Sequence, residues 1–224
     1  YMKEVFRLNR EEKNFRLMAP DETYSNKIDD VFGETKRAWV WPIMPWDKDM
    51  APDGRVMEML SEHGLQGLAQ GYILTGRHSV FASYEAFIQV VSSMMDQYAK
   101  FLIQSKDVPW RNPVSSFNYI LTSSGWRQDH NGFSHQNPGF IDDALRRQGE
   151  ITTIYFPPDA NSSLAVMEQA LSSVNGINVI VAGKTLEPRW LTPALARQEL
   201  RNGASVWDFA SDSDPQVVLA AAGD

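Results

Sequence analysis

From residue 57 onward, the chain alternates short apolar runs with longer amphipathic segments, and this alternation constrains the fold more than any other feature. Residues 117–122, 151–156 and 177–182 are nearly continuous apolar runs, which we expect to be strands, and residues 79–83 are expected to form a short strand or turn. Such strands, separated by helices, are typical of a parallel sheet that is covered on both faces. The sequence therefore predicts an α/β fold with a mostly parallel sheet and helices on both faces.

The predicted helices follow from apolar residues that recur at intervals of three and four. We expect helices at residues 57–72, 84–104, 140–147, 159–173 and 192–201. Residues 205–210 and 217–223 are expected to form two last strands. Because a domain seldom ends on a new strand, we expect the chain to be a piece of a longer protein.

The first 56 residues differ from the rest in composition. Trp39, Trp41 and Trp46, together with nearby prolines, mark a long irregular segment. We therefore expect residues 1–56 to form an N-terminal linker and an irregular Trp- and Pro-rich leading segment of the same domain. Residues 57–224 are expected to form the α/β core.

Composition excludes several classes of protein. The 224 residues carry 21 Lys and Arg against 28 Asp and Glu, which gives a net charge of −7 without a basic run, so we expect no nucleic-acid partner. No apolar stretch approaches the roughly 18 residues of a membrane span, and the pattern of a signal peptide is missing, so we expect a cytoplasmic protein. The absence of Cys excludes disulfides, thiolate nucleophiles and Cys-based metal sites.

A polar loop follows the predicted strand at residues 117–122. Residues 125–139 hold His130 and His135 among many groups that both donate and accept hydrogen bonds. Ligands of parallel sheets bind at the carboxyl ends of strands, so we interpret this loop as functional, with a plain surface loop as the alternative. Together with Asp129 or Glu62, the two histidines could also bind zinc, although their spacing matches no specific motif.

Three further positions each allow a structural and a functional interpretation. The carboxylate of Glu62 is either solvated or directed at a ligand nitrogen. Lys184 follows the predicted strand at residues 177–182, where it is either solvated or holds an anion such as a sugar phosphate. Residues 20–27 can cap a helix, and the same segment can also have a functional role, because the two interpretations do not conflict.

Six motifs together resemble the central domain of the thiamine diphosphate-dependent phosphoketolases, which act on xylulose 5-phosphate and fructose 6-phosphate. They run in family order across almost the whole chain: PDETYSN (20–26), APDGRVMEMLSEH (51–63), GYILTGRHSVFASYEAF (71–87), WRQDHNGFSHQNPG (126–139), YFPPDAN (155–161) and NVIVAGK (178–184). The resemblance implies a pyrimidine-binding domain of the transketolase type, with a thiamine diphosphate-binding fold.

The resemblance also implies roles around the cofactor. Glu62 corresponds to the glutamate that activates the cofactor, because a carboxylate bonded to N1′ of the aminopyrimidine stabilises its imino tautomer. Tyr84 and Phe87 match aromatic positions that pack around the aminopyrimidine, and Glu22 is assigned to the cofactor-binding residues. Phe87 is equally expected in the core, and one ring can do both.

Further residues are implied for catalysis and for the substrate. His130 and His135 are assigned as catalytic, and His135 resembles a proton-transfer group, which suits an imidazole that titrates near neutral pH. The residues implied to bind the sugar phosphate are Ser25, Lys27, Gln128, His130, Asn131 and Lys184. Lys27 stands where related sequences often have Arg, which keeps the charge but loses the bidentate fork.

The implied reaction cleaves the ketose phosphate and, with inorganic phosphate, gives acetyl phosphate and an aldose phosphate. The resemblance implies that the diphosphate and Mg²⁺ bind to an N-terminal domain of a neighbouring subunit, outside this chain, so we expect a homo-oligomer and an isolated chain without activity. The family's C-terminal domain is also expected to be absent from the chain. The alternatives are transketolase-type transfer of two carbons and a non-catalytic interaction module with the same fold.

Overall fold

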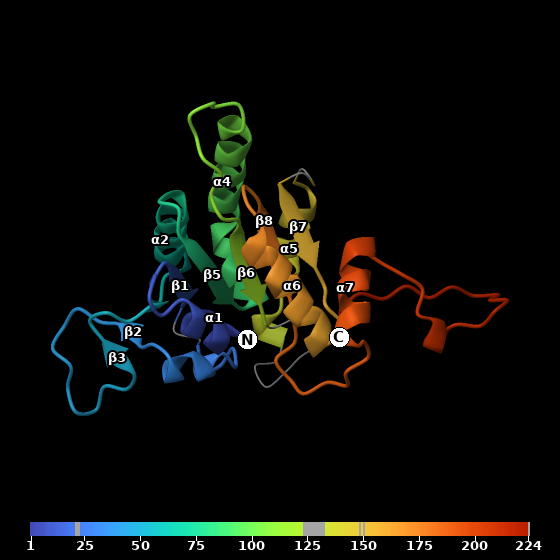
Figure 1. Ribbon diagram of the computed structural model, residues 1–224, viewed down its shortest axis with the longest axis horizontal. Helices are drawn as coiled ribbons and strands as arrows, with labels where there is room; N and C mark the ends of the chain where they lie inside the picture. Colours follow the sequence, from blue (N-terminus) through green and yellow to red (C-terminus); the bar gives the residue numbers. More distant parts are fainter. Residues whose placement is uncertain (21–22, 123–132, 148, 150, 224) are drawn as a thin grey trace.

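One parallel sheet forms the centre of the fold (Figure 1). The computed structural model describes residues 1–20, 23–122, 133–147, 149 and 151–223. Within these residues, eight strands pair in the order β3-β2-β4-β1-β5-β6-β8-β7, and every pairing between them is parallel. The strands are β1 (Phe15–Ala19), β2 (Arg37–Ala38), β3 (Met50–Ala51), β4 (Val56–Glu58), β5 (His78–Ser83), β6 (Phe117–Leu121), β7 (Thr152–Tyr155) and β8 (Ile177–Val181). The predicted α/β fold with a mostly parallel sheet is confirmed.

The register of the strands brings their carboxyl ends to one side of the sheet. Leu17 of β1 lies opposite Val80 of β5, while Leu121 of β6 lies opposite both Ser83 of β5 and Val181 of β8. Loops that are far apart in the sequence therefore begin next to one another. We call this side the carboxyl edge, and it comprises the residues that directly follow Ala19, Glu58, Ser83, Leu121, Tyr155 and Val181.

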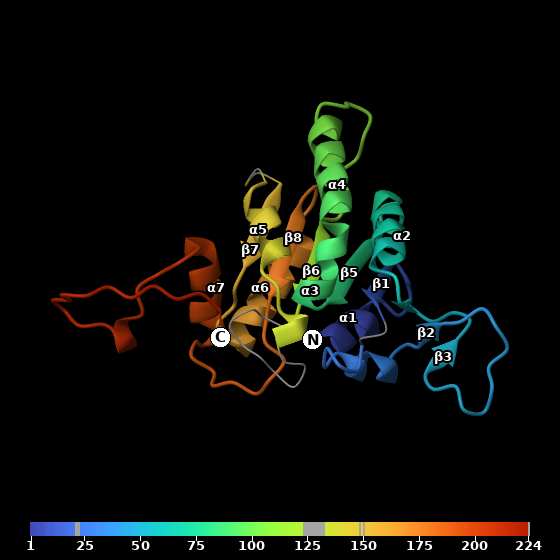
Figure 2. The same ribbon diagram turned by 180° about the vertical axis from the view of Figure 1, so that it is seen from behind.

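Helices cover both faces of the sheet, as predicted (Figures 1 and 2). One face is covered by α2 (Glu62–Leu74), α3 (Glu85–Ile88), α4 (Ser92–Ser105) and α5 (Gly139–Leu145). The other face is covered by α1 (Met2–Leu8), the 3₁₀ turn η1 (Asp29–Gly33) and α6 (Ala160–Ser172), and α7 (Pro193–Asn202) packs against α6. Further 3₁₀ turns are η2 (Gln89–Val91), η3 (Phe133–His135) and η4 (Asp208–Ala210). None of the helices described is both long and apolar enough to cross a membrane.

The side chains of the central strand β6 pack into the hydrophobic cores on both faces of the sheet. Phe117, Tyr119 and Leu121 pack with the helices on the face of α2, α4 and α5, while Ile120 packs on the face of α1 and α6. The hydroxyl of Tyr119 is fully buried and donates a hydrogen bond of 2.9 Å to Gln66 Oε1, and its burial raises its pKa far above the usual value. Because both faces of the strand are buried, its sequence is almost entirely apolar rather than alternating, with the buried amide of Asn118 as the exception.

Polar caps start three of the helices. Ser61, Asp159 and Thr192 each accept a hydrogen bond from a backbone N–H of the following turn, in α2, α6 and α7. The starts of the two later helices are confirmed. The predicted helix at residues 57–72 was wrong in its first turn, because residues 56–58 form β4, and the predicted helix at 84–104 is divided into α3, η2 and α4.

The first 56 residues contribute more to the fold than a linker. β1 lies inside the sheet between β4 and β5, and β2 and β3 extend the sheet beyond β4. Close packing occurs here too, since a Cβ added to Gly54 would lie 2.3 Å from the carbonyl of Arg37. β1, which pairs on both sides, is an element of residues 1–56 that the sequence did not predict.

The two strands predicted after residue 204 do not form. Residues 208–210 form η4, and the run around Val218, which is 83% exposed, is not assigned to a strand. This segment extends away from the sheet beyond α7 (Figure 1). An apolar run becomes a strand only when a neighbour pairs with its backbone, and no described strand does so here.

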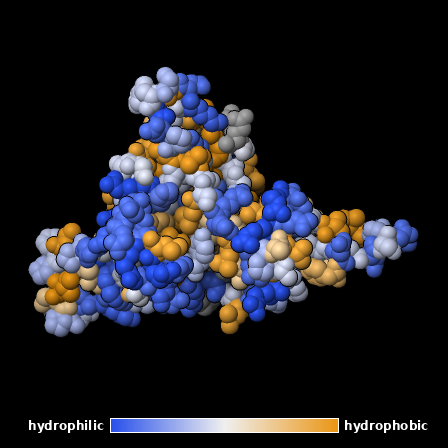
Figure 3. Space-filling view, in the orientation of Figure 1, coloured by the Kyte–Doolittle hydropathy of each residue, from blue (hydrophilic) through white to orange (hydrophobic). Residues whose placement is uncertain are grey.

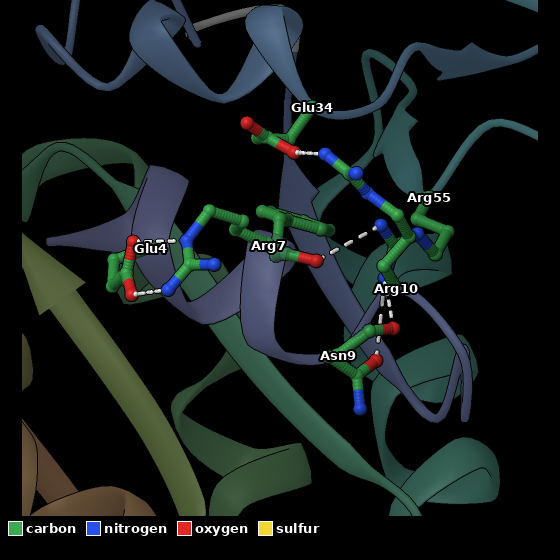
Figure 4. Close-up of polar contacts among 7 residues, drawn as sticks. Glu4, Arg7, Asn9, Arg10, Glu34 and Arg55 are labelled. Carbon is green, nitrogen blue, oxygen red and sulfur yellow. Dashed lines mark hydrogen bonds and ion pairs between the residues drawn. The ribbon is translucent and has the colours of Figure 1, made fainter.

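A buried arginine fixes the end of α1 against the sheet (Figure 4). Arg55 donates hydrogen bonds to the carbonyl oxygens of Asn9, at 2.8 Å, and Phe6, at 3.2 Å, and its guanidinium lies 4.9 Å from the centroid of the Phe6 ring. Burial lowers the pKa of Arg55, and the carbonyl groups at the end of the helix compensate part of this cost of desolvation. An ion pair between Arg10 and Glu34 ties the same region to η1.

Asp159 joins α6 to the segment that leads into α7. Its Oδ1 accepts a hydrogen bond of 2.8 Å from the N–H of Ser162, and its Oδ2 accepts bonds of 2.8 Å from the N–H groups of both Trp190 and Leu191. Burial by itself raises the pKa of Asp159, but these hydrogen bonds outweigh it and hold the pKa below its usual value.

We predict that Asp159→Asn lowers the free energy of unfolding of the chain by roughly 2–4 kcal/mol at pH 7. The side-chain NH₂ group of Asn is a donor, and it would face backbone N–H groups that are donors too. A carboxyl group whose pKa is lower in the folded than in the unfolded state stabilises the fold at pH values above its unfolded-state pKa. This stabilisation is lost as the pH falls through its folded-state pKa. Urea unfolding should therefore show a constant difference between the two proteins from pH 8 to 5, and a difference that shrinks below about pH 4. A difference that changes between pH 8 and 5 would contradict this account.

Candidate functional site

The site residues predicted from the sequence follow five neighbouring strands at the carboxyl edge. Ser25 and Lys27 come after β1, Glu62 comes after β4, Tyr84 and Phe87 come after β5, His135 comes after β6, and Lys184 comes after β8. β4, β1, β5, β6 and β8 are consecutive in the sheet. The fold thus gathers side chains from five separate parts of the sequence along one edge, where parallel sheets bind ligands.

Three aromatic rings meet above the end of β5. The ring of Tyr84 lies 5.7 Å from the ring of Phe87 and 5.1 Å from the imidazole of His135, both in edge-on orientation. The rings of Phe87 and His135 lie 4.9 Å apart. Tyr84 is nearly buried, at 2% exposure, whereas Phe87 and His135 are half-buried. The cluster therefore presents partly exposed ring surface at the carboxyl edge, which suits a flat heteroaromatic ligand.

Lys184 contacts this ring cluster from the end of β8. Its Nζ donates a hydrogen bond of 3.2 Å to the hydroxyl of Tyr84 and lies 4.3 Å from the centroid of the same ring. A cation is thus held against the aromatic cluster rather than extended into solvent. Lys184 is half-buried and contacts Tyr84, and its role in holding an anion stays a prediction.

A buried carboxylate that the sequence did not single out anchors the loop of His135. Glu85 begins α3, is fully buried, and accepts a hydrogen bond of 3.2 Å from the backbone N–H of Asn137. The side chain of Asn137 in turn accepts a bond of 2.9 Å from the N–H of Gly139 at the start of α5. Glu85 therefore holds residues 137–139 against α3, next to the ring cluster.

Glu62 is the first residue of α2, directly after the cap Ser61, and its side chain is half-buried. Its position places it at a helix N-terminus, where peptide N–H groups point outward. His63 beside it is exposed, and His78 begins β5 at the opposite side of the sheet. These two histidines therefore do not share the region of Tyr84 and His135.

The segment that follows β1 is fixed by buried polar contacts. Asn26 is hydrogen-bonded to Thr122 at the end of β6, and both side chains are buried. The N–H of Thr23 donates a bond of 3.3 Å to Oε1 of Glu58, the last residue of β4. Lys27 is exposed, with a positive φ of 60°. Sequence reasoning missed Glu58 and Thr122, because nothing in their local pattern shows which distant residue each one meets.

Some predicted site residues lie outside the part of the chain that the structure describes. These are Glu22, Gln128, His130 and Asn131, and Asp129 of the zinc alternative is among them. Among the residues described, no group of three or more His, Asp or Glu side chains is arranged to hold a metal ion.

Comparison with known families matches the chain along most of its length. The family model described as "D-xylulose 5-phosphate/D-fructose 6-phosphate phosphoketolase" matches residues 1–173, and the model of the "XFP C-terminal domain" matches residues 184–224. The second match differs from the expectation that residues 57–224 all belong to the pyrimidine-binding core and that the C-terminal domain is absent from the chain.

Several curated proteins are similar over the whole chain. "Probable phosphoketolase" of Bradyrhizobium diazoefficiens is 52% identical and that of Nitrosospira multiformis is 51% identical, each over 100% of this chain. "Probable phosphoketolase" of Rhodopirellula baltica is 49% identical. The chain spans 28% of the length of the first two proteins and 29% of the third.

Solved structures with the same fold are transketolases. Transketolase of Pichia stipitis in complex with sedoheptulose 7-phosphate superimposes with a TM-score of 0.61 at 14% identity, over 83% of this chain and 25% of that chain. A transketolase variant of the same organism in complex with xylulose 5-phosphate gives a TM-score of 0.60, also at 14% identity, over 83% and 25% of the two chains. The fold is thus the transketolase-like α/β fold, as predicted, and the sequence matches show that the chain belongs to the phosphoketolase family.

Proposed function

We propose that this chain is the part of a phosphoketolase that holds the aminopyrimidine end of thiamine diphosphate and one side of the sugar phosphate. The complete protein would cleave xylulose 5-phosphate, fructose 6-phosphate or both, acting as an aldehyde-lyase with inorganic phosphate as the acceptor. The products would be acetyl phosphate and an aldose phosphate. The observation that carries this proposal is the cluster of Tyr84, Phe87 and His135, with Lys184 against it, at the carboxyl edge of a phosphoketolase-family sheet.

The residues at the carboxyl edge fit an aminopyrimidine. Partly exposed ring surface from Phe87, supported by nearly buried Tyr84, offers a flat apolar wall. Half-buried Glu62 offers a carboxylate that can accept a hydrogen bond from a ring nitrogen. When bound, thiamine diphosphate supplies a carbon nucleophile. Glu62 would stabilise the tautomer that allows this carbon to lose its proton, and Glu22 remains a predicted cofactor contact.

His135 is proposed as the group that moves a proton near the reacting carbons. Its Nδ1 lies 2.9 Å from the hydroxyl oxygen of Ser134, so Nε2 is the nitrogen that we expect to face the substrate. The edge-on contact with Tyr84 and the tilted contact with Phe87 orient the imidazole. An oriented imidazole is suited to exchange a proton near neutral pH. His130 is proposed as a second catalytic histidine.

The phosphate end of the sugar is proposed to meet cations and amides from three loops. Ser25 and Lys27 would contribute from the segment after β1, Lys184 from the end of β8, and Gln128, His130 and Asn131 from the loop after β6. The first three follow β1 and β8, on either side of β5 and β6 in the sheet. The chain has a net negative charge, so the binding of an anion requires several hydrogen-bond donors around one site.

The diphosphate group and Mg²⁺ are proposed to bind to the N-terminal domain of a neighbouring subunit, so the working protein would be a homo-oligomer. Exposed apolar residues support a further protein surface here. Leu60, two residues before Glu62, is 82% exposed, and the loop between β2 and β3 exposes Trp41 and Trp46. Hydrophobic residues gather on the surface at the end of the molecule where this loop lies (Figure 3). A cytoplasmic location remains a prediction from the sequence.

We predict that the complete protein forms acetyl phosphate from fructose 6-phosphate or xylulose 5-phosphate only when inorganic phosphate is present. Phosphate is the proposed acceptor of the two-carbon unit, so acetyl phosphate should be absent without it. Product analysis by NMR, with and without phosphate, measures this. A protein that instead transfers two carbons to an added aldose phosphate, at a rate independent of phosphate, would be a transketolase, and one without either product would be a non-catalytic module.

A second prediction concerns Glu62. In the complete protein, Glu62→Gln should slow the exchange of the C2 proton of bound thiamine diphosphate by about a hundredfold or more, because an amide cannot hold the required tautomer as a carboxylate does. Deuterium exchange followed by quenching and NMR measures this rate. Glu12→Gln is a matched control, since Glu12 is exposed and precedes the amino end of β1. Exchange at the wild-type rate in Glu62→Gln would remove Glu62 from this role.

A further inference from the structure

Arg37 and Glu58 form an ion pair between neighbouring strands beside the carboxyl edge. The guanidinium Nε of Arg37, in β2, is bonded to Oε2 of Glu58, the last residue of β4, and the side chains are only 14% and 7% exposed. Salt bridges in partly buried positions gain little net stability, because desolvation offsets the attraction. The role of the pair is therefore better explained by the residues that it holds in place.

Both members of the pair contact the segment that follows β1. Oε1 of Glu58 accepts a hydrogen bond of 3.3 Å from the backbone N–H of Thr23, whose side chain is fully buried. The guanidinium carbon of Arg37 lies 4.4 Å from the centroid of the Phe32 ring and 5.3 Å from that of Tyr24. The pair thus contacts this segment at Thr23 and Tyr24 and again at Phe32.

The other side of the segment is held by a second contact. Asn26 is hydrogen-bonded to Thr122, at the end of β6, and so reaches across the end of β5. Within the segment, the N–H of Ile28 bonds to the carbonyl of Thr23 at 3.2 Å and the N–H of Lys27 to that of Tyr24 at 3.1 Å. These bonds close a turn in which Lys27 takes a left-handed backbone conformation. Such a conformation is unfavourable for a residue other than glycine, so it persists because the surrounding contacts enforce it.

We propose that Arg37 and Glu58 are positioning residues, which fix residues 23–27 so that Ser25 and Lys27 meet the phosphate group of the sugar. This inference rests on the proposed function, because it assigns the sugar phosphate to these two side chains. Neither Arg37 nor Glu58 needs to touch the substrate. Their effect is to keep a short turn in one conformation at the carboxyl edge, and loss of the pair leaves Thr23 without its acceptor on β4.

The test uses the complete protein with the variants Arg37→Met and Glu58→Gln, their double variant, and Arg37→Lys. Each disrupting variant should raise KM for the sugar phosphate about tenfold, with kcat and the affinity for thiamine diphosphate changed less than threefold. The double variant should be no worse than either single one, because both remove the same interaction. Arg37→Lys, which keeps the charge, should restore part of the loss.

Arg147→Met is the matched control. Arg147 is paired with Asp96 and is also largely shielded, but it lies near the amino end of β7, on the opposite side of the sheet. This control should lower the melting temperature as the Arg37 variant does, without a change in KM. If Glu58→Gln and Arg37→Met are folded and leave KM within twofold of the wild type, the pair is only structural and the inference is wrong. If Arg37→Met does not fold, Glu58→Gln and Arg37→Lys decide in the same way.

A separate outcome distinguishes failure of the proposed function. If the wild-type protein forms no acetyl phosphate, the proposed function fails, and the positioning role is then decided by calorimetric binding of inorganic phosphate. Weaker binding by Arg37→Met and Glu58→Gln than by Arg147→Met supports the role. Equal affinities, or no binding by any of the proteins, overturn it.

Discussion

The parallel pairing of β1, β5, β6 and β8 is the constraint on which the rest of the structure depends. Parallel pairing sends each strand out of the sheet on the same side and requires a crossover before the next strand begins. The crossovers α2, α4 and α6 cover the two faces, and the loops that precede them all begin at the carboxyl edge. Residues more than a hundred positions apart, such as Lys27 and Lys184, are thereby brought to one side of the molecule.

The candidate site combines fixed and adaptable parts. Tyr84 follows a buried strand directly and is itself nearly buried, so the ring cluster has a rigid base. His135 instead belongs to a loop, and contacts with Tyr84 and Phe87, together with the bond from Asn137 to Glu85, determine where this loop lies. A rigid aromatic wall beside a loop that carries the polar groups is a common arrangement in enzymes that bind a cofactor and a sugar.

The sequence predicted the elements whose pattern is local. β6 and β8 were found because burial on both faces makes every residue of Ile177–Val181 apolar or amide, and α7 because Thr192 and Pro193 mark its start. β1 was missed because Arg16 interrupts a run of only five residues. The run at 217–223 was wrongly predicted as a strand, because the sequence does not show whether a partner strand exists. Tyr84 and Phe87 came from the resemblance to a family, whereas Lys184 was already noted for its place after a predicted strand. Glu58, Glu85 and Thr122 were not found from the sequence, because each contacts a partner that only the fold brings near.

The most direct test of this account is a cross-link between Asn26 and Thr122, which lie 96 residues apart. They follow β1 and β6, two strands that β5 separates in the sheet. The 224 residues contain no Cys, so the pair Asn26→Cys and Thr122→Cys introduces the only two thiols in them. We predict that oxidation, or a short bis-thiol reagent, joins these residues within one molecule, as shown by mass spectrometry of its peptides. A control with Asn26→Cys and Thr153→Cys, on the edge strand β7, should remain unlinked. A folded Asn26/Thr122 variant that forms no link would contradict the arrangement of loops along the carboxyl edge.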